Sequence, residues 1–177
     1  TEVTRCSHFG LLVGQHVTTN ALGVLGLVIQ NANDVETALS NLVRYRSLND
    51  RGAFITLERD GALARLQYSM IDYTAAGADQ IVDCAVAIGC NILRGLCGHN
   101  WAPTEIMLAH GRPQDSRPFH NFFRCPVSFG APSQLTSVAG FALTVAGTAA
   151  GIAATAACAA STFVRASASW PSSVSIR

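Results

Sequence analysis

The sequence contains no lysine, so all 12 of its basic residues are arginines, and 11 acidic residues nearly balance them. The formal net charge at pH 7 is +1, and charged residues make up only 13% of the chain. That share is about half of what an ordinary soluble domain carries. A near-neutral chain without a basic cluster lacks the electrostatic footprint of nucleic-acid binding. The composition therefore gives no reason to expect DNA binding through charge, and we attribute the missing lysine to GC-rich codon usage.

Paired cysteine motifs and a signal peptide are also absent. The first ten residues, "TEVTRCSHFG", are polar and lack the apolar stretch of a secretory signal. No two cysteines form a Cys-x-x-Cys pair, which would indicate zinc or redox chemistry. The six cysteines are Cys6, Cys84, Cys90, Cys97, Cys125 and Cys158. We expect these to be free thiols in a reducing cytoplasm.

Several apolar patterns have the spacing of helices. Residues 21–30, "ALGVLGLVIQ", are almost wholly apolar and predict a buried helix, although a strand fits the same run. A second helix is expected after Asn33 or Asp34, either of which can cap its first turn. A long helix is predicted from Ala76 to Leu96. The stripe expected to face the core on this long helix comprises Ile81, Cys84, Ile88, Ile92 and Leu96.

Other patterns are typical of strands. Apolar and polar residues alternate on both sides of Asp60 and Gly61, a dipeptide typical of hairpin turns. Further along, prolines and glycines bracket short apolar runs. We predict a hairpin in residues 53–71, a short strand in residues 104–110, a short helix around residues 115–123 and a strand at residues 127–129. These elements predict an α+β fold in which helices pack on a small, mainly antiparallel sheet.

The composition changes after residue 131. Arg165 and Arg177 are the only charged residues that follow, in a segment rich in Ala, Ser, Thr and Gly. We therefore divide the chain into a domain over residues 1–131 and an Ala/Ser/Thr-rich tail over residues 132–177, for which disorder or a shifted reading frame are candidate explanations. Three interpretations of the tail stay open. They are a membrane helix over residues 138–164, which are enough to span a bilayer, a loosely folded Ala-rich helix, and a sequence outside the ancestral reading frame.

Two stretches carry a resemblance to a known family: "HFGLLVGQHVTTNALGVLGLVIQNANDVETALSNLVRYRSL" and "LRGLCGHNWAPTEIMLAHGRPQDSRPFHNFFRCPVSFGAP". The second has a glycine, an aromatic, a proline, an apolar strand ending in histidine, another proline, an aromatic-Phe pair and an apolar-x-Phe strand. These are Gly98, Trp101, Pro103, Ile106 to His110, Pro113, Phe119, Phe122, Phe123 and Val127 to Phe129. From His8 to Pro132 the chain resembles the N-terminal, arabinose-binding-like effector domain of AraC-type bacterial transcription regulators.

The resemblance implies that residues 1–131 are an effector-binding and dimerisation domain, a cytoplasmic, ligand-sensing unit that binds an unknown small-molecule effector and forms a homodimer. It implies no cofactor and no membrane association. Family members continue into two helix-turn-helix units that read DNA, and the segment after residue 131 offers no amphipathic basic unit of that kind. Relative to the family, the chain also lacks a helical layer at its N-terminus. We therefore expect a truncated regulator, incomplete at its N-terminus, that contacts DNA only through a helix-turn-helix part missing here.

One stretch, "GHNWAPTEIMLAHGRP", raises the question of enzyme chemistry. His99, Glu105 and His110, with Cys97 as a fourth donor, are candidate zinc ligands of a metal-dependent enzyme. However, the two histidines are not spaced as on one helix face. Strand alternation also places Glu105 on the face opposite His110. We favour a structural role in which His110 ends a strand and its ring bonds to a loop carbonyl.

Other catalytic signals are missing. The sequence has no Gly-x-Ser-x-Gly elbow and no glycine-rich phosphate loop. Cys90 and Cys97 share a helix face, but buried cysteines commonly act as small apolar side chains. We predict that the chain is not an enzyme and has no catalytic, metal-binding or DNA-binding residues. Individual ligand contacts are unassigned, and the candidate pocket walls are residues 25–29, the hairpin face with Tyr68 and the inner face of the long helix.

Overall fold

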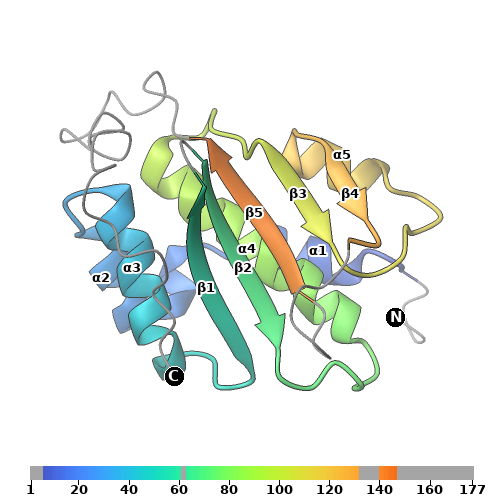
Figure 1. Ribbon diagram of the computed structural model, residues 1–177, viewed down its shortest axis with the longest axis horizontal. Helices are drawn as coiled ribbons and strands as arrows, with labels where there is room; N and C mark the ends of the chain where they lie inside the picture. Colours follow the sequence, from blue (N-terminus) through green and yellow to red (C-terminus); the bar gives the residue numbers. More distant parts are fainter. Residues whose placement is uncertain (1–5, 61–62, 132–139, 147–177) are drawn as a thin grey trace.

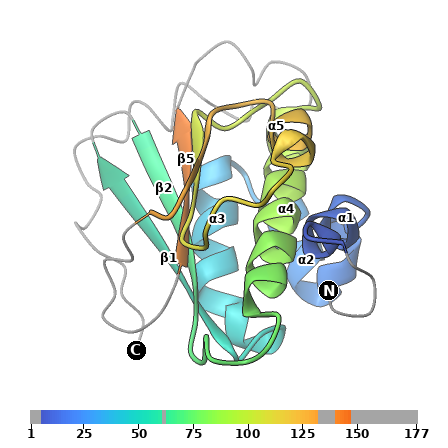
Figure 2. The same cartoon turned by 90° about the vertical axis from the view of Figure 1, so that its right-hand side faces the viewer.

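The computed structural model describes residues 6–60, 63–131 and 140–146, which form one α+β unit (Figure 1). Its helices are α1 (Phe9–Gln15), α2 (Val24–Gln30), α3 (Val35–Tyr45), α4 (Ala78–Cys97) and α5 (Arg117–Phe123), with 3-10 turns η1 (Thr19–Leu22) and η2 (Arg46–Leu48). Its strands are β1 (Ala53–Asp60), β2 (Leu63–Met70), β3 (Glu105–Leu108), β4 (Val127–Phe129) and β5 (Gly140–Ala146). Helices α3 and α4 lie on one face of the sheet, and α1 and α2 lie farther out (Figure 2). The predicted fold class is confirmed.

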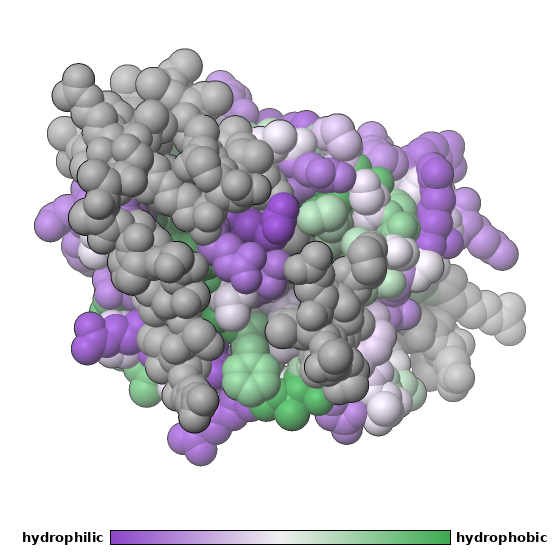
Figure 3. All heavy atoms as spheres, viewed as in Figure 1, coloured by the Kyte–Doolittle hydropathy of each residue, from purple (hydrophilic) through white to green (hydrophobic). Residues whose placement is uncertain are grey.

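The sheet has the strand order β1-β2-β5-β3-β4, and all neighbours are antiparallel except β3 and β4. The predicted hairpin is confirmed by β1 and β2, in which Ile55 pairs with Tyr68. Alternation turns Ile55 toward the helices and leaves Phe54, on the other face, 44% exposed. On that helix-free face the described surface is hydrophilic at its centre and hydrophobic along its lower margin (Figure 3).

One central strand comes from the segment that the sequence analysis placed in the tail. Residues 140–146, "GFALTVA", form β5, in which Leu143 pairs with Leu66 of β2 and Ile106 of β3. Large and small residues alternate here, but the Ala- and Gly-rich surroundings mask that pattern. Seven residues of the candidate membrane span 138–164 therefore belong to the sheet. The other interpretations of the tail concern residues that lie outside the described part of the chain.

Helix α4 is the central element of the core. It begins after Gly77, whose φ of 85° favours glycine, and ends at Gly98 with φ of 98°. The stripe predicted to face the core is wrong, because only Ile92 of its five members is buried and Ile81 is 47% exposed. The buried face comprises Val82, Val86, Ala87, Cys90, Leu93 and Cys97. Apolar residues of α4 occupy most of the circumference of the helix. Helical spacing alone therefore permits two apolar stripes and does not show which one is buried.

Helix α1, which the sequence analysis did not predict, packs closely on α4 through two glycines. A Cβ atom on Gly10 would lie 1.9 Å from the Gln80 carbonyl oxygen, and one on Gly14 would lie 2.6 Å from the Ala87 Cβ. The Gly10 N–H donates to Gln80 Oε1 at 2.8 Å. At the other end of α1, Asn91 Nδ2 donates to three backbone carbonyls within 3.1 Å. Polar side chains of α4 therefore satisfy both ends of a short helix that has no cap of its own.

The opposite end of the sheet is closed by α5. Phe119 and Phe123 are both fully buried and belong to the core. The Arg94 guanidinium of α4 donates to the Phe122 carbonyl at 2.6 Å and lies 4.6 Å from the Phe122 ring. Within the described residues, α4 is the one helix long and apolar enough to cross a membrane by length and composition, and here it is covered by α1 and the sheet.

Candidate ligand-binding pocket

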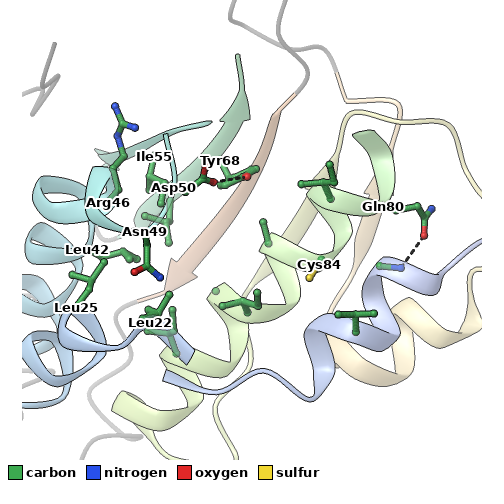
Figure 4. A pocket seen from close by; sticks show the side chains of 18 of the residues that line it. Leu22, Leu25, Leu42, Arg46, Asn49, Asp50, Ile55, Tyr68, Gln80 and Cys84 are labelled. Carbon is green, nitrogen blue, oxygen red and sulfur yellow. Dashed lines mark hydrogen bonds between the residues drawn. The ribbon is translucent and has the colours of Figure 1, made fainter. Parts of the chain in front are cut away.

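A cavity of about 480 Å³ lies between α4, the outer helices and the β1–β2 hairpin (Figure 4). Each of the three pocket walls proposed from the sequence contributes to it. Leu25 comes from the first segment, Tyr68 from the hairpin and Ile88 from α4. The remaining apolar lining includes Phe9, Val13, Leu22, Leu42, Ile55, Leu66, Ile81, Ala85 and Ile92. The stripe that the sequence analysis assigned to the core thus largely borders this cavity instead.

The cavity has one polar end, where η2 meets the hairpin. The Tyr68 hydroxyl donates to Asp50 Oδ2 at 2.9 Å, and Asp50 Oδ1 accepts the Gly52 N–H at 2.7 Å. Burial and the neighbouring Asp50 carboxylate raise the pKa of Tyr68 well above its ordinary value, so its hydroxyl stays protonated and donates. The Asn49 side chain, which also lines the cavity, is directed toward Leu42 and Leu22 and away from this pair (Figure 4). A carboxylate and a phenol are therefore paired at one end of an apolar space.

Arg46 also borders this end, but its guanidinium is held away from the cavity. Its Nη1 donates to the Ala53 carbonyl at 2.5 Å. The guanidinium carbon lies 4.9 Å from the centroid of Phe54, which is on the helix-free face of the sheet. Figure 4 shows the side chain directed away from Asn49 and Leu42. The positive charge therefore faces away from the lining, while its aliphatic stem contributes to the wall.

The α4 wall combines a thiol with an empty position. Cys84 is half-buried, and burial followed by the nearby Asp83 charge raises the pKa of its thiol, which disfavours a reactive thiolate. Gly89 also lines the cavity, and a Cβ atom there would have no heavy atom within 4 Å. The cavity is open to solvent next to Phe9, Val13 and Ile81, which are 42%, 42% and 47% exposed. A small molecule therefore has both an entrance and unfilled space.

The residues singled out in "GHNWAPTEIMLAHGRP" do not converge on one site. Glu105 accepts a hydrogen bond from Ser128 Oγ at 2.8 Å, on the face of β3 opposite Ile106 and Leu108. His99 is exposed and contributes its carbonyl to the Arg124 guanidinium at 2.7 Å. Among the described residues, no group of three or more His, Cys, Asp or Glu side chains is placed to hold a metal ion.

His110 does bond to a loop carbonyl, as predicted, but it also has a partner that the sequence analysis missed. Nδ1 lies 2.9 Å from the Gly111 carbonyl, and Nε2 lies 2.8 Å from Asp83 Oδ1. Both ring nitrogens face oxygen acceptors, so the doubly protonated ring is the form that satisfies both contacts. The signal that could have revealed this pair is the single aspartate on the apolar middle of α4.

The Asp83–His110 pair is almost completely shielded from water, with side chains 0% and 8% exposed. Burial lowers the pKa of His110, but the hydrogen bond and charge of Asp83 raise it by more, and its net shift is upward. Burial raises the pKa of Asp83, and His110 only partly offsets this. Asp83 Oδ2 has no hydrogen-bond partner among the described residues. Because β3 ends at Leu108 and not at His110 as predicted, the pair is a buried electrostatic link between α4 and the loop after β3, outside the cavity lining.

Cys90, Cys97 and Cys125 behave as packing groups. Cys90 and Cys97 are buried at 0% and 6% exposure, as expected of cysteines that act as small apolar side chains. Burial raises the pKa of Cys90 to about 12 and that of Cys125 to about 11. Thiolates at these positions are therefore scarce near neutral pH, which does not support a thiol sensor at Cys90 and Cys97.

Comparisons with known proteins place the chain in context. Residues 1–144 match the family model described as the arabinose-binding domain of AraC transcription regulators, N-terminal. The crystal structure of the transcriptional regulator CdpR from Pseudomonas aeruginosa is similar in fold, with a TM-score of 0.67 and 23% sequence identity. That match covers 92% of this chain and 50% of the other, so the chain spans about half the length of that regulator. No match was found among curated proteins.

Proposed function

The chain belongs to the family of N-terminal arabinose-binding domains of AraC transcription regulators, and on that premise we propose that it senses a small-molecule effector in the cavity between α4, α3 and the hairpin. The observation that carries this proposal is the preformed, open cavity of about 480 Å³. Small-molecule sites are typically concave, mostly apolar and about 300–1,000 Å³ in volume, with a few polar groups that orient the ligand. Asp50, Tyr68 and Asn49 supply such polar groups here.

We also propose that the cavity is a binding site and not a catalytic centre. Among the described lining residues, the one hydroxyl that is hydrogen-bonded to a possible general base is that of Tyr68, which donates to Asp50. Tyr68 and Cys84 have raised pKa values, which keep both groups protonated and weakly nucleophilic. Binding a ligand requires only a surface of matching shape and polarity, which a mostly apolar lining with one polar end can supply to an amphipathic molecule. An effector that is bound and released unchanged is the outcome most consistent with these side chains.

Effector binding would act through the elements that surround the cavity. The outer helices, α4 and the hairpin all contribute lining residues, so a ligand contacts several elements that are far apart in sequence. A ligand shifts a conformational equilibrium only if its affinity for the two states differs. We propose that it favours one arrangement of α1 and α3 relative to α4 in a cytoplasmic homodimer. DNA contact would then belong to a helix-turn-helix part of the regulator and not to the described residues.

A cavity-filling substitution tests the proposal directly. Gly89→Phe places a ring in the open space on α4, whereas Gly89→Ala adds a single methyl group at the same position. We expect the chain to bind the neutral fluorescent probe N-phenyl-1-naphthylamine saturably, with the Phe variant weakened by about tenfold or more and the Ala variant within about twofold. Circular dichroism melting verifies that both variants fold. If folded Gly89→Phe binds the probe as well as the unmodified chain, the effector site is not this cavity.

A further inference from the structure

We infer that the cavity selects amphipathic ligands with a protonated amine, whose ammonium group binds the Asp50 carboxylate while its apolar body lies along α4. This inference rests on the proposed function and adds a ligand class to it. It depends on two features of the polar end: the charge of Asp50 and the orientation of Arg46. Both favour a positively charged group.

Among the described residues, the Asp50 carboxylate has hydrogen bonds but no counter-charge. It accepts from the Gly52 N–H at 2.7 Å and from the Tyr68 hydroxyl at 2.9 Å, both neutral donors. Within the part of the chain that the structure describes, no basic group lies within 4.0 Å of it. The carboxylate lies at the edge of an apolar space. A cation that binds there gains a charge-assisted hydrogen bond without displacing an existing ion pair.

Arg46 does not neutralise this charge, although it borders the same end. Its guanidinium is engaged by the Ala53 carbonyl and the Phe54 ring, on the outer side of the hairpin. A ligand carboxylate would therefore meet the negative charge of Asp50 before it met any cation of the lining. Like charges this close are repelled, so acidic ligands are disfavoured.

The rest of the lining suits the body of such a ligand. The Asn49 side chain also lines the cavity, but it is directed toward Leu42 and Leu22 and away from Asp50 (Figure 4). An ammonium group has three N–H donors, which the oxygens of the Asp50 carboxylate can accept. The remaining lining from Leu25 to Ile88 is apolar and fits a hydrocarbon or aromatic body.

Three probes with one chain length and different head groups test this inference: octylamine, octanol and octanoate, each below its micelle concentration. Their dissociation constants are measured by displacement of N-phenyl-1-naphthylamine from the unmodified chain. We expect octylamine to bind about tenfold more tightly than octanol, and octanoate to bind most weakly. Asp50→Asn should reduce the preference for octylamine over octanol to within about twofold. Asp72→Asn, which removes an exposed carboxylate outside the lining, should leave the preference unchanged.

The outcomes separate this inference from the proposed function. If octanol or octanoate binds as tightly as octylamine or more tightly, the amine preference is overturned. The cavity remains supported as the binding site in that case, provided that Gly89→Phe still weakens probe binding. Binding of all three probes that is insensitive to Gly89→Phe overturns both. The comparison of the three probes on the unmodified chain decides the matter even if Asp50→Asn does not fold. An amine preference that persists in folded Asp50→Asn assigns the charge recognition to another group and contradicts the role given to Asp50.

Discussion

The two sides of helix α4 differ in how completely they are filled. Toward β3, β4 and α5, side chains interlock: Phe119 and Phe123 are fully buried, and the Phe119 ring lies 5.5 Å from that of Phe129. Toward α1, α3 and the hairpin, Ile81 and Cys84 instead border an open cavity. The first side forms a rigid support, and the second leaves unfilled space. The difference indicates where a ligand can enter without disrupting the core that positions it.

Truncation of one large side chain on each side gives the strongest contrast. Phe119→Ala removes a fully buried ring and should lower the free energy of unfolding by about 3–5 kcal/mol. Ile88→Ala acts on a half-buried residue that already borders empty space, and we expect a loss of less than about 1.5 kcal/mol. Urea denaturation of both variants provides the measurement. Similar losses would show that the cavity side is packed as tightly as the closed side.

The contact between α1 and α4 offers a second comparison, between two glycines in opposite environments. Gly10→Ala forces a methyl group against the Gln80 backbone and should destabilise the fold by about 1–3 kcal/mol. Gly89→Ala places the same group in open space within a helix and should stabilise it by up to about 1 kcal/mol. Thermal unfolding followed by circular dichroism distinguishes the two signs. A neutral Gly10→Ala would mean that α1 does not pack closely on α4.

The buried Asp83–His110 pair on the closed side gives a smaller, pH-dependent effect. The fold raises the pKa of His110 above its unfolded value of 6.5. The stability that His110 contributes is therefore complete at pH values below 6.5 and is lost as the pH rises through its pKa in the folded state. The pKa of Asp83 is also raised, from 3.8, so its contribution to stability likewise decreases as the pH rises. We therefore expect the free energy of unfolding to fall between about pH 6 and about pH 8, by at most about 1.4 kcal/mol per pH unit for one group. The measurement is urea denaturation at a series of pH values.

His110→Gln is the control for this pH dependence, because it keeps hydrogen-bonding capacity and removes the titrating ring. Its stability should change less between about pH 6 and about pH 8 than that of the unmodified chain. A pH dependence of equal size in His110→Gln would assign the effect to other titrating groups and contradict the role given to this pair.

Much of the fold could be predicted from local patterns. Asp34 caps α3 by accepting the Thr37 N–H at 2.7 Å, as its position before an apolar stripe indicated. The alternation in β1 and β2 gave the hairpin. Local patterns did not predict β5, because the sequence on both sides of it is rich in Ala, Ser, Thr and Gly. They did not predict α1 either, because Gly10 and Gly14 weaken the helical signal. Both elements are formed through tertiary contacts that local spacing does not report.

The candidate site was only partly visible in the sequence, for a physical reason. Apolar residues that line a cavity have the same spacing as those that fill a core, so Ile81, Cys84 and Ile88 were assigned to the core. The pairing of Asp50 with Tyr68 joins residues 18 apart through the hairpin, and the pairing of Asp83 with His110 joins residues 27 apart. Such contacts depend on strand register and on helix placement, which single-sequence spacing does not fix.

The central claim, that effectors bind in this cavity, is tested most directly by isoleucine methyl NMR during a titration with octylamine. The account predicts shifts of the four isoleucine methyl groups that line the cavity, those of Ile55, Ile81, Ile88 and Ile92, with little change at Ile29 and Ile106, which are fully buried elsewhere in the core. Saturable shifts centred on Ile106, with the four cavity methyl groups unmoved, would contradict it.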